Sequence, residues 1–480
     1  MVSVRVYGGA GEIGGNKILI NTKETKIFLD FGTSFTRKRR FYGGFIKVKR
    51  FRILEEYALT GILPELPGIY REDLLGNLTH MNTNEPLVDA CIITHAHLDH
   101  CGHASFLRSD IKLYVGATAA ILLEAREDTK MGKEPEDQIV QMKDYRDGRV
   151  FKRQMDTFST GKQLKIGDVN AVPIHVDHST PSSYGLVLEM DEARIAYTGD
   201  FRLHGPMRKM TEDFIERTSR EDVDSLIIEG TRINDPLIHS EESVMLSMIS
   251  SLRDAQGKAA VALIGPLDFD RLRSLMSAAE HMGRELVLSP KLAYVVDRLA
   301  KRATNIQVPE LRSKVLSVYL EPSGSGGYKP KKDYRGWLRK FLCECQDIGV
   351  RLITPESLAK QMGKYIFTLC QTEDLPELIS IKPEPGSIFL FSSSEPHNEE
   401  QEIERERVIN WLELFNMRPV YAHASGHASQ GEVISTIEKI SPRTIIPVHT
   451  EYPEMFRKLL ERHGIKSKVI EPATSQEIVI

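Results

Sequence analysis

The segment Thr94-His95-Ala96-His97-Leu98-Asp99-His100 constrains the fold and chemistry of this chain more than any other. It places three imidazoles and one carboxylate within six residues, directly after an apolar run, 90–93, that is typical of a short β-strand. Histidine and aspartate are ligand types that zinc and other first-row metals prefer. A strand that ends in such a turn predicts a metal site at the edge of a sheet.

The composition is that of a globular protein. The 480 residues are 41% hydrophobic and 27% charged, with a formal net charge of -4. The sequence contains no apolar run of about 18 residues, the length needed to span a bilayer. We therefore expect no membrane association and a cytoplasmic location. Five cysteines in so long a chain do not form a disulfide framework, so we expect them to be reduced.

Near the N-terminus, the segment GAGEIG has the G-x-G-x-x-G spacing of a dinucleotide-binding turn, with Gly9, Gly11 and Gly14. Two strand-like runs, 17–20 and 27–29, follow it, and the helix whose N-terminus would bind a pyrophosphate is missing from the pattern. The glycines therefore favour a tight turn between two strands.

Two kinds of pattern divide the chain. Apolar runs that end in polar loops dominate the first part, whereas from about residue 212 helical stretches such as 241–255 and 268–283 alternate with short strands such as 259–265. This alternation predicts a separate α/β domain. We expect a first domain over residues 1–211, an inserted domain over 212–420 and a return to the first domain over 421–480.

Residues 37–52, RKRRFYGGFIKVKRFR, combine eight Lys or Arg with four aromatic residues and no acid. Cations neutralise phosphates and rings stack on bases, so this stretch suits a polynucleotide. A solvated basic loop is the alternative interpretation. The first four cations, Arg37, Lys38, Arg39 and Arg40, are candidate substrate-binding residues.

The H-x-H-x-D-H pattern of residues 95–100 resembles the signature of the metallo-β-lactamase-fold hydrolases. The resemblance implies an α/β fold, an αββα sandwich, with Asp30 as an early aspartate that supports the ligand loop without touching metal. It also implies two Zn²⁺ ions, with Mn²⁺ or Mg²⁺ as alternatives in activity. The implied ligands are His95, His97 and His178 for one ion, Asp99, His100 and His449 for the other, and Asp200 shared between them.

The block between Asp200 and His449 resembles the β-CASP domain of the nucleic-acid-processing branch of these hydrolases. Glu229, His427 and His449 match its three short motifs in order. The resemblance implies that His427, held by Glu229, protonates the departing 3′ oxygen, and that Asp99 also orients the attacking water. Histidine at the position of His449 is typical of the RNA enzymes of the family, whereas DNA enzymes such as Artemis typically carry valine.

Within this branch the closest resemblance is to RNase J, especially its short archaeal form. It rests on the segments GGAGEIGGN, SSSEP and HASGHAS. The same resemblance makes a set of residues in the last two segments candidates for holding a substrate phosphate: Ser392, Ser393, Ser394, His423 and Ser425.

We therefore expect a zinc-dependent ribonuclease that degrades single-stranded RNA from 5′ to 3′ and releases nucleoside 5′-monophosphates. An endoribonuclease of RNA processing is one alternative. A catalytically silent RNA-binding subunit is another, disfavoured because all seven ligand positions are filled. A homodimer or an RNA-processing complex is the expected assembly, although the sequence stops soon after the last motif and lacks the C-terminal dimerisation domain of many bacterial members.

Overall fold

The structure is a computed structural model that describes residues 2–130, 134–392 and 399–480. The chain forms two compact units, one of residues 1–237 and 426–480 and one of residues 238–425. In the described ranges, no helix combines the length and the apolar character needed to cross a membrane. The five cysteines are free, as predicted.

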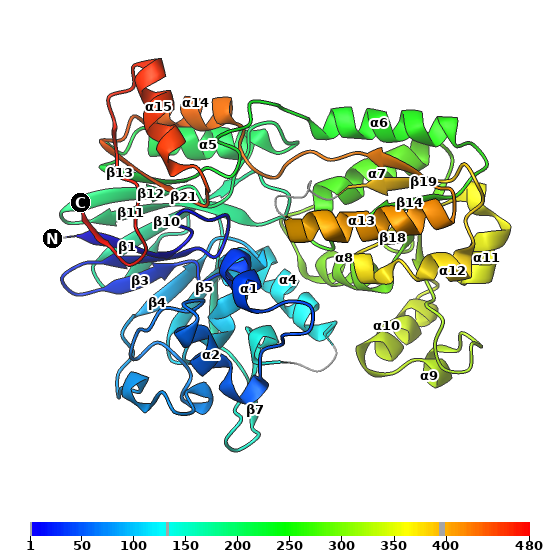
Figure 1. Cartoon of the computed structure of the whole chain (residues 1–480), viewed down its shortest axis with the longest axis horizontal. Helices are drawn as coiled ribbons and strands as arrows, with labels where there is room; N and C mark the ends of the chain where they lie inside the picture. Colours follow the sequence, from blue (N-terminus) through cyan, green and yellow to red (C-terminus); the bar gives the residue numbers. More distant parts are fainter. Residues whose placement is uncertain (1, 131–133, 393–398) are drawn as a thin grey trace. The chain divides into compact units, whose positions relative to one another are not determined.

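The first unit is built on two seven-stranded sheets (Figure 1). One sheet has the order β23 (Glu477–Val479), β1 (Ser3–Gly8), β2 (Lys17–Asn21), β3 (Lys26–Leu29), β4 (Ala90–Ile93), β5 (Lys112–Gly116) and β8 (Met155–Phe158). The other has the order β22 (Lys468–Val469), β21 (Thr444–Val448), β13 (Ser225–Glu229), β12 (Ala193–Tyr197), β11 (Ser183–Met190), β10 (Val169–Val176) and β9 (Leu164–Ile166). A short ribbon of β6 (Gln141–Lys143) and β7 (Val150–Lys152) stands apart from both.

One apolar core lies between the two sheets, because strands of both contribute to it, for example Val4 and Ile18 from the first and Leu186 and Tyr197 from the second. A second core lies on the other face of the second sheet, under α5 (Arg208–Thr218), α14 (Gln430–Ile440) and α15 (Pro453–His463). On the side of the first sheet lie α1 (Phe35–Phe41), α2 (Ile53–Leu59), α3 (Leu98–Cys101) and α4 (Ala117–Asp128). This is the αββα sandwich that the sequence predicts.

The glycine-rich segment is a turn, as the sequence predicts. It joins β1 to β2, which pair antiparallel with Ser3 opposite Asn21, and no helix follows Gly14. Gly9, Gly11 and Gly14 have φ of 90°, 65° and 76°, a region in which only glycine is unstrained. The dinucleotide interpretation is therefore excluded by the local fold.

Parallel strands fix the place of the functional side chains. Strands β3, β4 and β5 run parallel in the first sheet, and β12, β13 and β21 run parallel in the second. Asp30, Thr94 and His449 directly follow β3, β4 and β21, and Glu229 ends β13. Because the carboxyl ends of parallel strands lie along one edge of a sheet, these residues gather at one edge of the sandwich.

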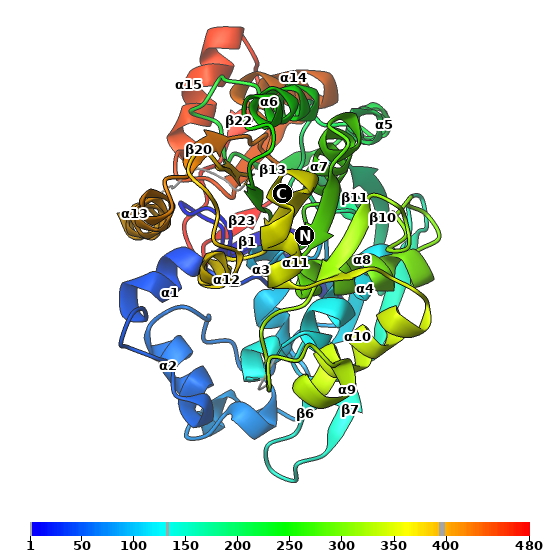
Figure 2. The same ribbon diagram turned by 90° about the vertical axis from the view of Figure 1, so that its right-hand side faces the viewer.

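The second unit holds a parallel sheet of order β17 (Leu352–Ile353), β16 (Leu316–Tyr319), β15 (Glu285–Leu288), β18 (Tyr365–Leu369), β14 (Ala260–Leu263), β19 (Ile388–Phe391) and β20 (Arg418–Tyr421). Figure 2 shows α12 (Glu377–Ile381) and α13 (Glu399–Leu414) on one side of it, and α7 (Phe269–His281) and α8 (Pro290–Arg302) on the other. The remaining helices are α6 (Glu241–Asp254), α9 (Pro330–Asp333), α10 (Gly336–Asp347) and α11 (Pro355–Lys360). Helices α6 and α7 confirm the two helical stretches that the sequence predicts.

The boundaries of the two units differ from those expected. The sequence placed the start of the inserted domain at residue 212, but residues 212–237 lie in the first unit, where β13 pairs with β12 and β21 in the middle of the second sheet. The second boundary falls between residues 425 and 426, where 420 and 421 were expected.

Candidate metal centre

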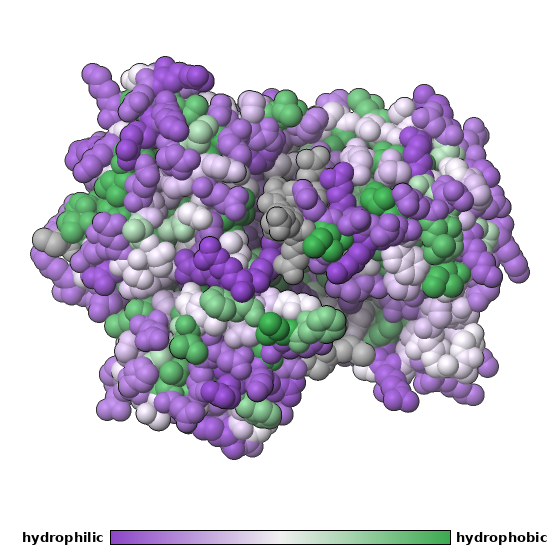
Figure 3. Space-filling model, viewed as in Figure 1, coloured by the Kyte–Doolittle hydropathy of each residue, from purple (hydrophilic) through white to green (hydrophobic). Residues whose placement is uncertain are grey.

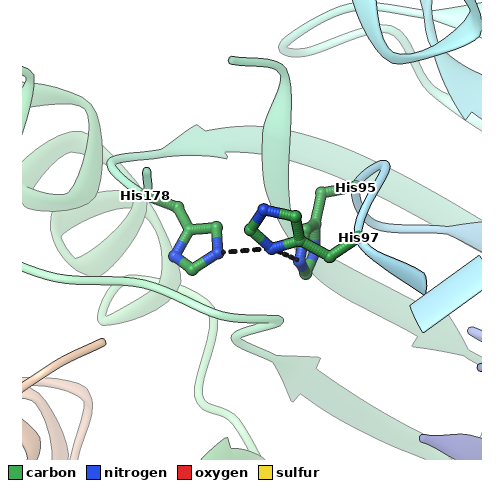
Figure 4. Close-up of side chains that lie close together, drawn as sticks. All are labelled: His95, His97 and His178. Atoms are coloured by element: carbon green, nitrogen blue, oxygen red, sulfur yellow. Dashed lines mark hydrogen bonds between the residues drawn. The ribbon is translucent and has the colours of Figure 1, made fainter. Parts of the chain in front are cut away.

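Three histidines converge in the first unit (Figure 4). His95 and His97 come from the loop after β4, and His178 comes from the segment after β10. Nδ1 of His97 lies 3.2 Å from Nε2 of His95 and 3.1 Å from Nε2 of His178. Three imidazole nitrogens within 4.8 Å of one another form a candidate site for a divalent metal.

A second group shares the same edge of the sandwich. It consists of Asp99, His100, Asp200 and His449, whose ligand atoms also lie within 4.8 Å of one another. Nε2 of His449 is 3.1 Å from Oδ2 of Asp99, and Nε2 of His100 is 3.1 Å from Oδ2 of Asp200. Two imidazoles and two carboxylates are again a donor set that suits a first-row metal.

Asp200 connects the two groups. Its Oδ2 lies 3.7 Å from Nε2 of His95, 3.9 Å from Nε2 of His178 and 3.7 Å from Nε2 of His449. Both of its carboxylate oxygens are buried without a hydrogen bond among the described residues, and so is Nε2 of His100. Buried polar atoms are normally satisfied, so their inward orientation fits a bound metal cation beside Asp200.

Asp30 supports the ligand loop from outside. Its carboxylate accepts hydrogen bonds from the backbone N–H of Thr94 at 2.7 Å, from Nδ1 of His100 at 2.7 Å and from the hydroxyl of Tyr197 at 2.9 Å. Because Nδ1 of His100 faces Asp30, the ring nitrogen that faces Asp200 and the centre is Nε2. Asp30 therefore orients a candidate ligand and does not belong to either candidate group.

Two other histidines have their second nitrogen occupied in the same way. Nδ1 of His178 donates to the carbonyl oxygen of Gly426 at 2.6 Å, and Nδ1 of His449 donates to Oγ1 of Thr231 at 2.8 Å. Thr231 in turn donates to Glu229 at 2.6 Å. In both rings Nε2 is left with its lone pair toward the centre, which is the tautomer that a metal ligand requires.

Burial and charge set the protonation of the centre. Burial lowers the pKa of His97 to about 4 and the pKa of His95 and His178 well below its usual value, so these three rings are neutral. Burial opposes the charged form of His100 as well, but the carboxylates of Asp200 and Asp30 raise its pKa well above the usual value. Neutral imidazoles such as His95, His97 and His178 can bind a metal. A bound metal cation would also balance the negative charge of the buried carboxylates.

Glu229 and His427 form a pair beside the centre. Nδ1 of His427 lies 3.2 Å from both carboxylate oxygens of Glu229 and 3.7 Å from Oδ2 of Asp200. Burial lowers the pKa of His427, but the charges of Glu229 and Asp200 outweigh burial and raise it to about 9. Glu229 is buried, whereas the side chain of His427 remains 22% exposed. The pair thus presents a protonated imidazole next to the candidate ligands.

The glycine turn packs directly against Asp99. A Cβ on Gly14 would lie 2.7 Å from Cβ of Asp99, and the carbonyl oxygen of Gly9 accepts a hydrogen bond from the backbone N–H of His449 at 2.8 Å. Glu12, in the same turn, is buried and accepts hydrogen bonds from the N–H of Gly9 and from Ser34. The turn therefore packs against two candidate ligands, Asp99 and His449, and restricts their positions.

Four supporting side chains have no signal in the sequence that would single them out: Glu12, Thr94, Tyr197 and Thr231. Tyr197 meets Asp30 across 167 positions and Thr231 meets His449 across 218 positions. Only the closeness of Thr94 to the histidines and of Thr231 to Glu229 could have suggested a role.

The predicted phosphate-binding residues differ from one another in burial and in the contacts that they make. Ser392 is buried, and its hydroxyl donates to the carbonyl oxygen of Ala422 at 3.1 Å, a contact inside the second unit. Ser393 and Ser394 lie outside the described residues. His423 and Ser425 are half-buried residues of the second unit.

The predicted cations of residues 37–40 are partly engaged in structural contacts. Nη2 of Arg37 lies 2.9 Å from Glu12, and its Nη1 donates to the carbonyl oxygens of Tyr7 and Gly61. Nζ of Lys38 lies 2.9 Å from Glu136. Arg39 and Arg40 are exposed. The first two cations therefore hold the fold together locally, which the basic stretch alone did not reveal.

Two family models match the chain. A β-lactamase superfamily domain matches residues 72–263, and a Zn-dependent metallo-hydrolase RNA specificity domain matches residues 415–470. A solved structure, of a protein of unknown function from Enterococcus faecalis V583, superimposes with a TM-score of 0.73 at 20% identity and covers 100% of both chains. The protein is thus a metallo-β-lactamase-fold chain with an inserted α/β unit.

Within the metallo-β-lactamase-fold proteins, the chain is similar to several curated relatives that are named ribonuclease J. Ribonuclease J of Sinorhizobium meliloti is 23% identical over 83% of this chain and 64% of its own length, and ribonuclease J of Helicobacter pylori strain B128 is 23% identical over 95% and 57%. Ribonuclease J of Mycoplasma genitalium is 20% identical over 97% of this chain and 71% of its own. The two family models, together with ribonuclease J relatives over most of the chain, support a protein of RNase J type in the β-CASP metallo-β-lactamase superfamily. The chain spans 57% to 64% of the length of the first two of these relatives.

Proposed function

We propose that this protein is a metal-dependent ribonuclease that degrades single-stranded RNA from the 5′ end and releases nucleoside 5′-monophosphates. The observation that carries the proposal is the convergence of seven metal-ligand side chains with the Glu229–His427 pair in one unit. The matched RNA specificity domain and the names of the curated relatives support RNA as the substrate.

The metals that we propose are two Zn²⁺ ions. His95, His97 and His178 would hold one, Asp99, His100 and His449 the other, and Asp200 both. Mn²⁺ or Mg²⁺ are the alternatives in activity. Such a pair, when bound, activates a water molecule and stabilises the negative charge that develops on a phosphodiester in hydrolysis.

The chain's own residues supply the proton transfers. Burial opposes the charge on Asp99, but the hydrogen bond and charge of His449 hold the pKa of this carboxyl below its usual range, so Asp99 stays ionised and can orient a water molecule. Glu229 holds Nδ1 of His427, so the proton to be given to the departing 3′ oxygen is the one on Nε2. Contacts from Asp30 to His100, from Thr231 to His449 and from the glycine turn to Asp99 hold these side chains in position.

The predicted substrate-phosphate contacts form part of the same proposal. Ser393, Ser394, His423 and Ser425 are proposed to hold a phosphate of the RNA. The hydroxyl of Ser392 is buried and already donates to the carbonyl oxygen of Ala422, so a structural role suits Ser392 better than a phosphate contact.

One experiment tests the function and its mode. The protein is incubated with single-stranded RNA that carries a 5′-monophosphate and a label at either end, and with a circular RNA of the same sequence. Mononucleotides released from the 5′ label with an intact circle support the proposal. A cut circle identifies an endoribonuclease, and binding without cleavage of either RNA identifies a silent subunit.

A further inference from the structure

The last turn of α1 and the chain that leads from it to α2 form an arm, which we define as residues 39–52. Its rings are unusually exposed: Phe41 is 46% exposed, Phe51 83% and Phe45, at the tip, 104%. Single exposed apolar residues are common, but three large rings within eleven positions mark an interaction surface. Figure 3 shows hydrophobic surface among hydrophilic surface over α1 and the turn that follows it.

The arm has a defined backbone. Gly43 and Ile46 exchange two backbone hydrogen bonds of 3.1 and 3.0 Å across a tight turn in which Gly44 has φ 54°, and this turn lifts Phe45 to the tip. Glu56 of α2 fastens the two ends of the turn, because it accepts from the hydroxyl of Tyr42 and from the backbone N–H of Lys49, both at 3.2 Å. These hydrogen bonds fix the backbone that carries the exposed rings.

The cations of the arm fall into two classes. Arg50 pairs with Glu134 and Arg52 pairs with Glu55. Within the described residues, by contrast, the side chains of Arg40, Lys47 and Lys49 are exposed and have no ion pair. Unpaired cations interleaved with bare rings complement a chain that alternates anionic phosphates with flat bases. The RNA specificity domain matched at residues 415–470 favours RNA over an anionic lipid surface, which also takes up rings and cations.

The start of the arm's first helix lies beside the metal centre. Ser34 is the N-cap of α1, and a Cβ on Gly15 would lie 2.8 Å from its Cα. Gly14, the neighbouring residue, contacts Asp99. A strand bound along the arm would thus lie on the same unit as Asp99 and approach it along α1.

We infer that the arm is a stacking platform for single-stranded RNA, with Phe45 and Phe51 as base-stacking rings and Arg40, Lys47 and Lys49 as phosphate contacts. The inference rests on the proposed function in taking RNA as the partner. It moves the predicted RNA contacts from Arg37 and Lys38, which pair with Glu12 and Glu136, to the rings and cations beyond them.

Binding is measured by fluorescence anisotropy with a labelled single-stranded RNA about 20 nucleotides long, over a range of KCl concentrations. The protein is the metal-loaded full chain carrying His427→Ala, so that RNA is not consumed. The double variant Phe45→Ala, Phe51→Ala is expected to weaken binding about tenfold for each ring without changing the salt dependence. The triple variant Arg40→Gln, Lys47→Gln, Lys49→Gln is expected to reduce the slope of log affinity against log salt by about 0.7 for each lost phosphate contact.

Matched controls keep the test specific. Leu59→Ala removes an exposed apolar side chain, 87% exposed, at the end of α2. The triple Lys439→Gln, Lys458→Gln, Lys466→Gln removes the same charge from exposed positions of the same unit. Both controls should bind as the parent does. Thermal unfolding verifies that every variant is folded.

Three results would overturn the inference. The first is an unchanged RNA affinity in the ring variant. The second is a loss of affinity for fully paired duplex RNA, in the ring variant, that equals its loss for single-stranded RNA. The third is a parent protein that sediments as a dimer and a ring variant that sediments as a monomer, because the rings would then form a subunit contact. If the parent chain cleaves no RNA but the ring variant still loses RNA binding, the platform stands and the proposed nuclease activity falls. If cleavage proceeds with unchanged KM in the ring variant, only the platform falls.

Discussion

Nδ1 of His427 is equidistant, at 3.2 Å, from the two carboxylate oxygens of Glu229, so a proton transfer from this ring to the substrate would use Nε2. We predict that His427→Ala lowers kcat on RNA by about 100- to 10,000-fold, the usual contribution of a general acid, while metal content is kept. A 3′-bridging phosphorothiolate substrate, whose leaving thiolate needs no proton, should lose much less. Equal losses on the two substrates would refute the role.

The sharing of Asp200 between two donor groups predicts a stepwise loss of metal. His97→Ala removes one nitrogen from the three-histidine group, so elemental analysis after dialysis should fall from about two ions per chain to about one. Asp200→Asn removes the shared charge and should weaken both sites. His281→Ala, which alters an exposed histidine of α7, is the control and should change nothing. A purified protein without any transition metal would contradict the proposed cofactors.

The contact between Gly14 and Asp99 predicts unequal effects of two similar substitutions. Gly11 and Gly14 both have positive φ, so alanine adds roughly 1–2 kcal/mol of backbone strain at either position. A Cβ on Gly11 meets no atom within 4 Å, whereas a Cβ on Gly14 would displace Asp99. We expect Gly14→Ala to lower kcat by about 100-fold, as misplacement by about 1 Å can do, and Gly11→Ala to keep it close to the wild-type value. Comparable kcat in both variants would contradict the bracing role of the turn.

Burial, assisted by the charges of Glu377 and Asp374, raises the pKa of Glu321 in the second unit to about 7. The folded state therefore binds more protons than the unfolded state between the ordinary glutamate pKa of 4.5 and about 7, and stability from this group falls as pH rises through that window. Glu321→Gln should accordingly raise the free energy of unfolding by roughly 1–3 kcal/mol at about pH 8 and leave it nearly unchanged at about pH 4.5. Thermal unfolding at the two pH values measures the difference.

Glu373→Gln is the control for this last variant, because Glu373 is an exposed acid of the same unit. It should show no pH-dependent gain. A Glu321→Gln chain that is stabilised equally at both pH values would show that the ionisation of Glu321 is not the cause.

The elements that the sequence predicted well are those whose signal is local. The strand at 90–93, the turn of glycines and helices α6 and α7 depend on apolar spacing and turn residues within a short window. The grouping of the candidate ligands could be expected because the motifs that contain them resemble the metallo-β-lactamase signature. The membership of β13 in the second sheet could not, because its neighbour β21 lies more than two hundred positions further along the chain.

Side-chain partners were the least predictable feature. The basic stretch gave Arg37 the same expectation as Arg40, but only Arg37 finds the buried carboxylate of Glu12. Thr231 reaches His449 for the same reason that Tyr197 reaches Asp30, namely the packing of distant strands against one another. Charge and spacing in a sequence indicate which groups can interact, and the tertiary fold decides which of them do.

The first unit is assembled from two stretches of chain, and this affects when it can become active. His427 and His449 come from the later stretch, and β1 pairs on one side with β23, so Ser3 lies opposite Val479. A ribosome that has made the chain only as far as the second unit has made six of the seven proposed ligands but neither the seventh nor the proposed proton donor. On the proposed function, the nascent chain therefore lacks a complete centre until residues 426–480 have been made and have folded onto the first stretch.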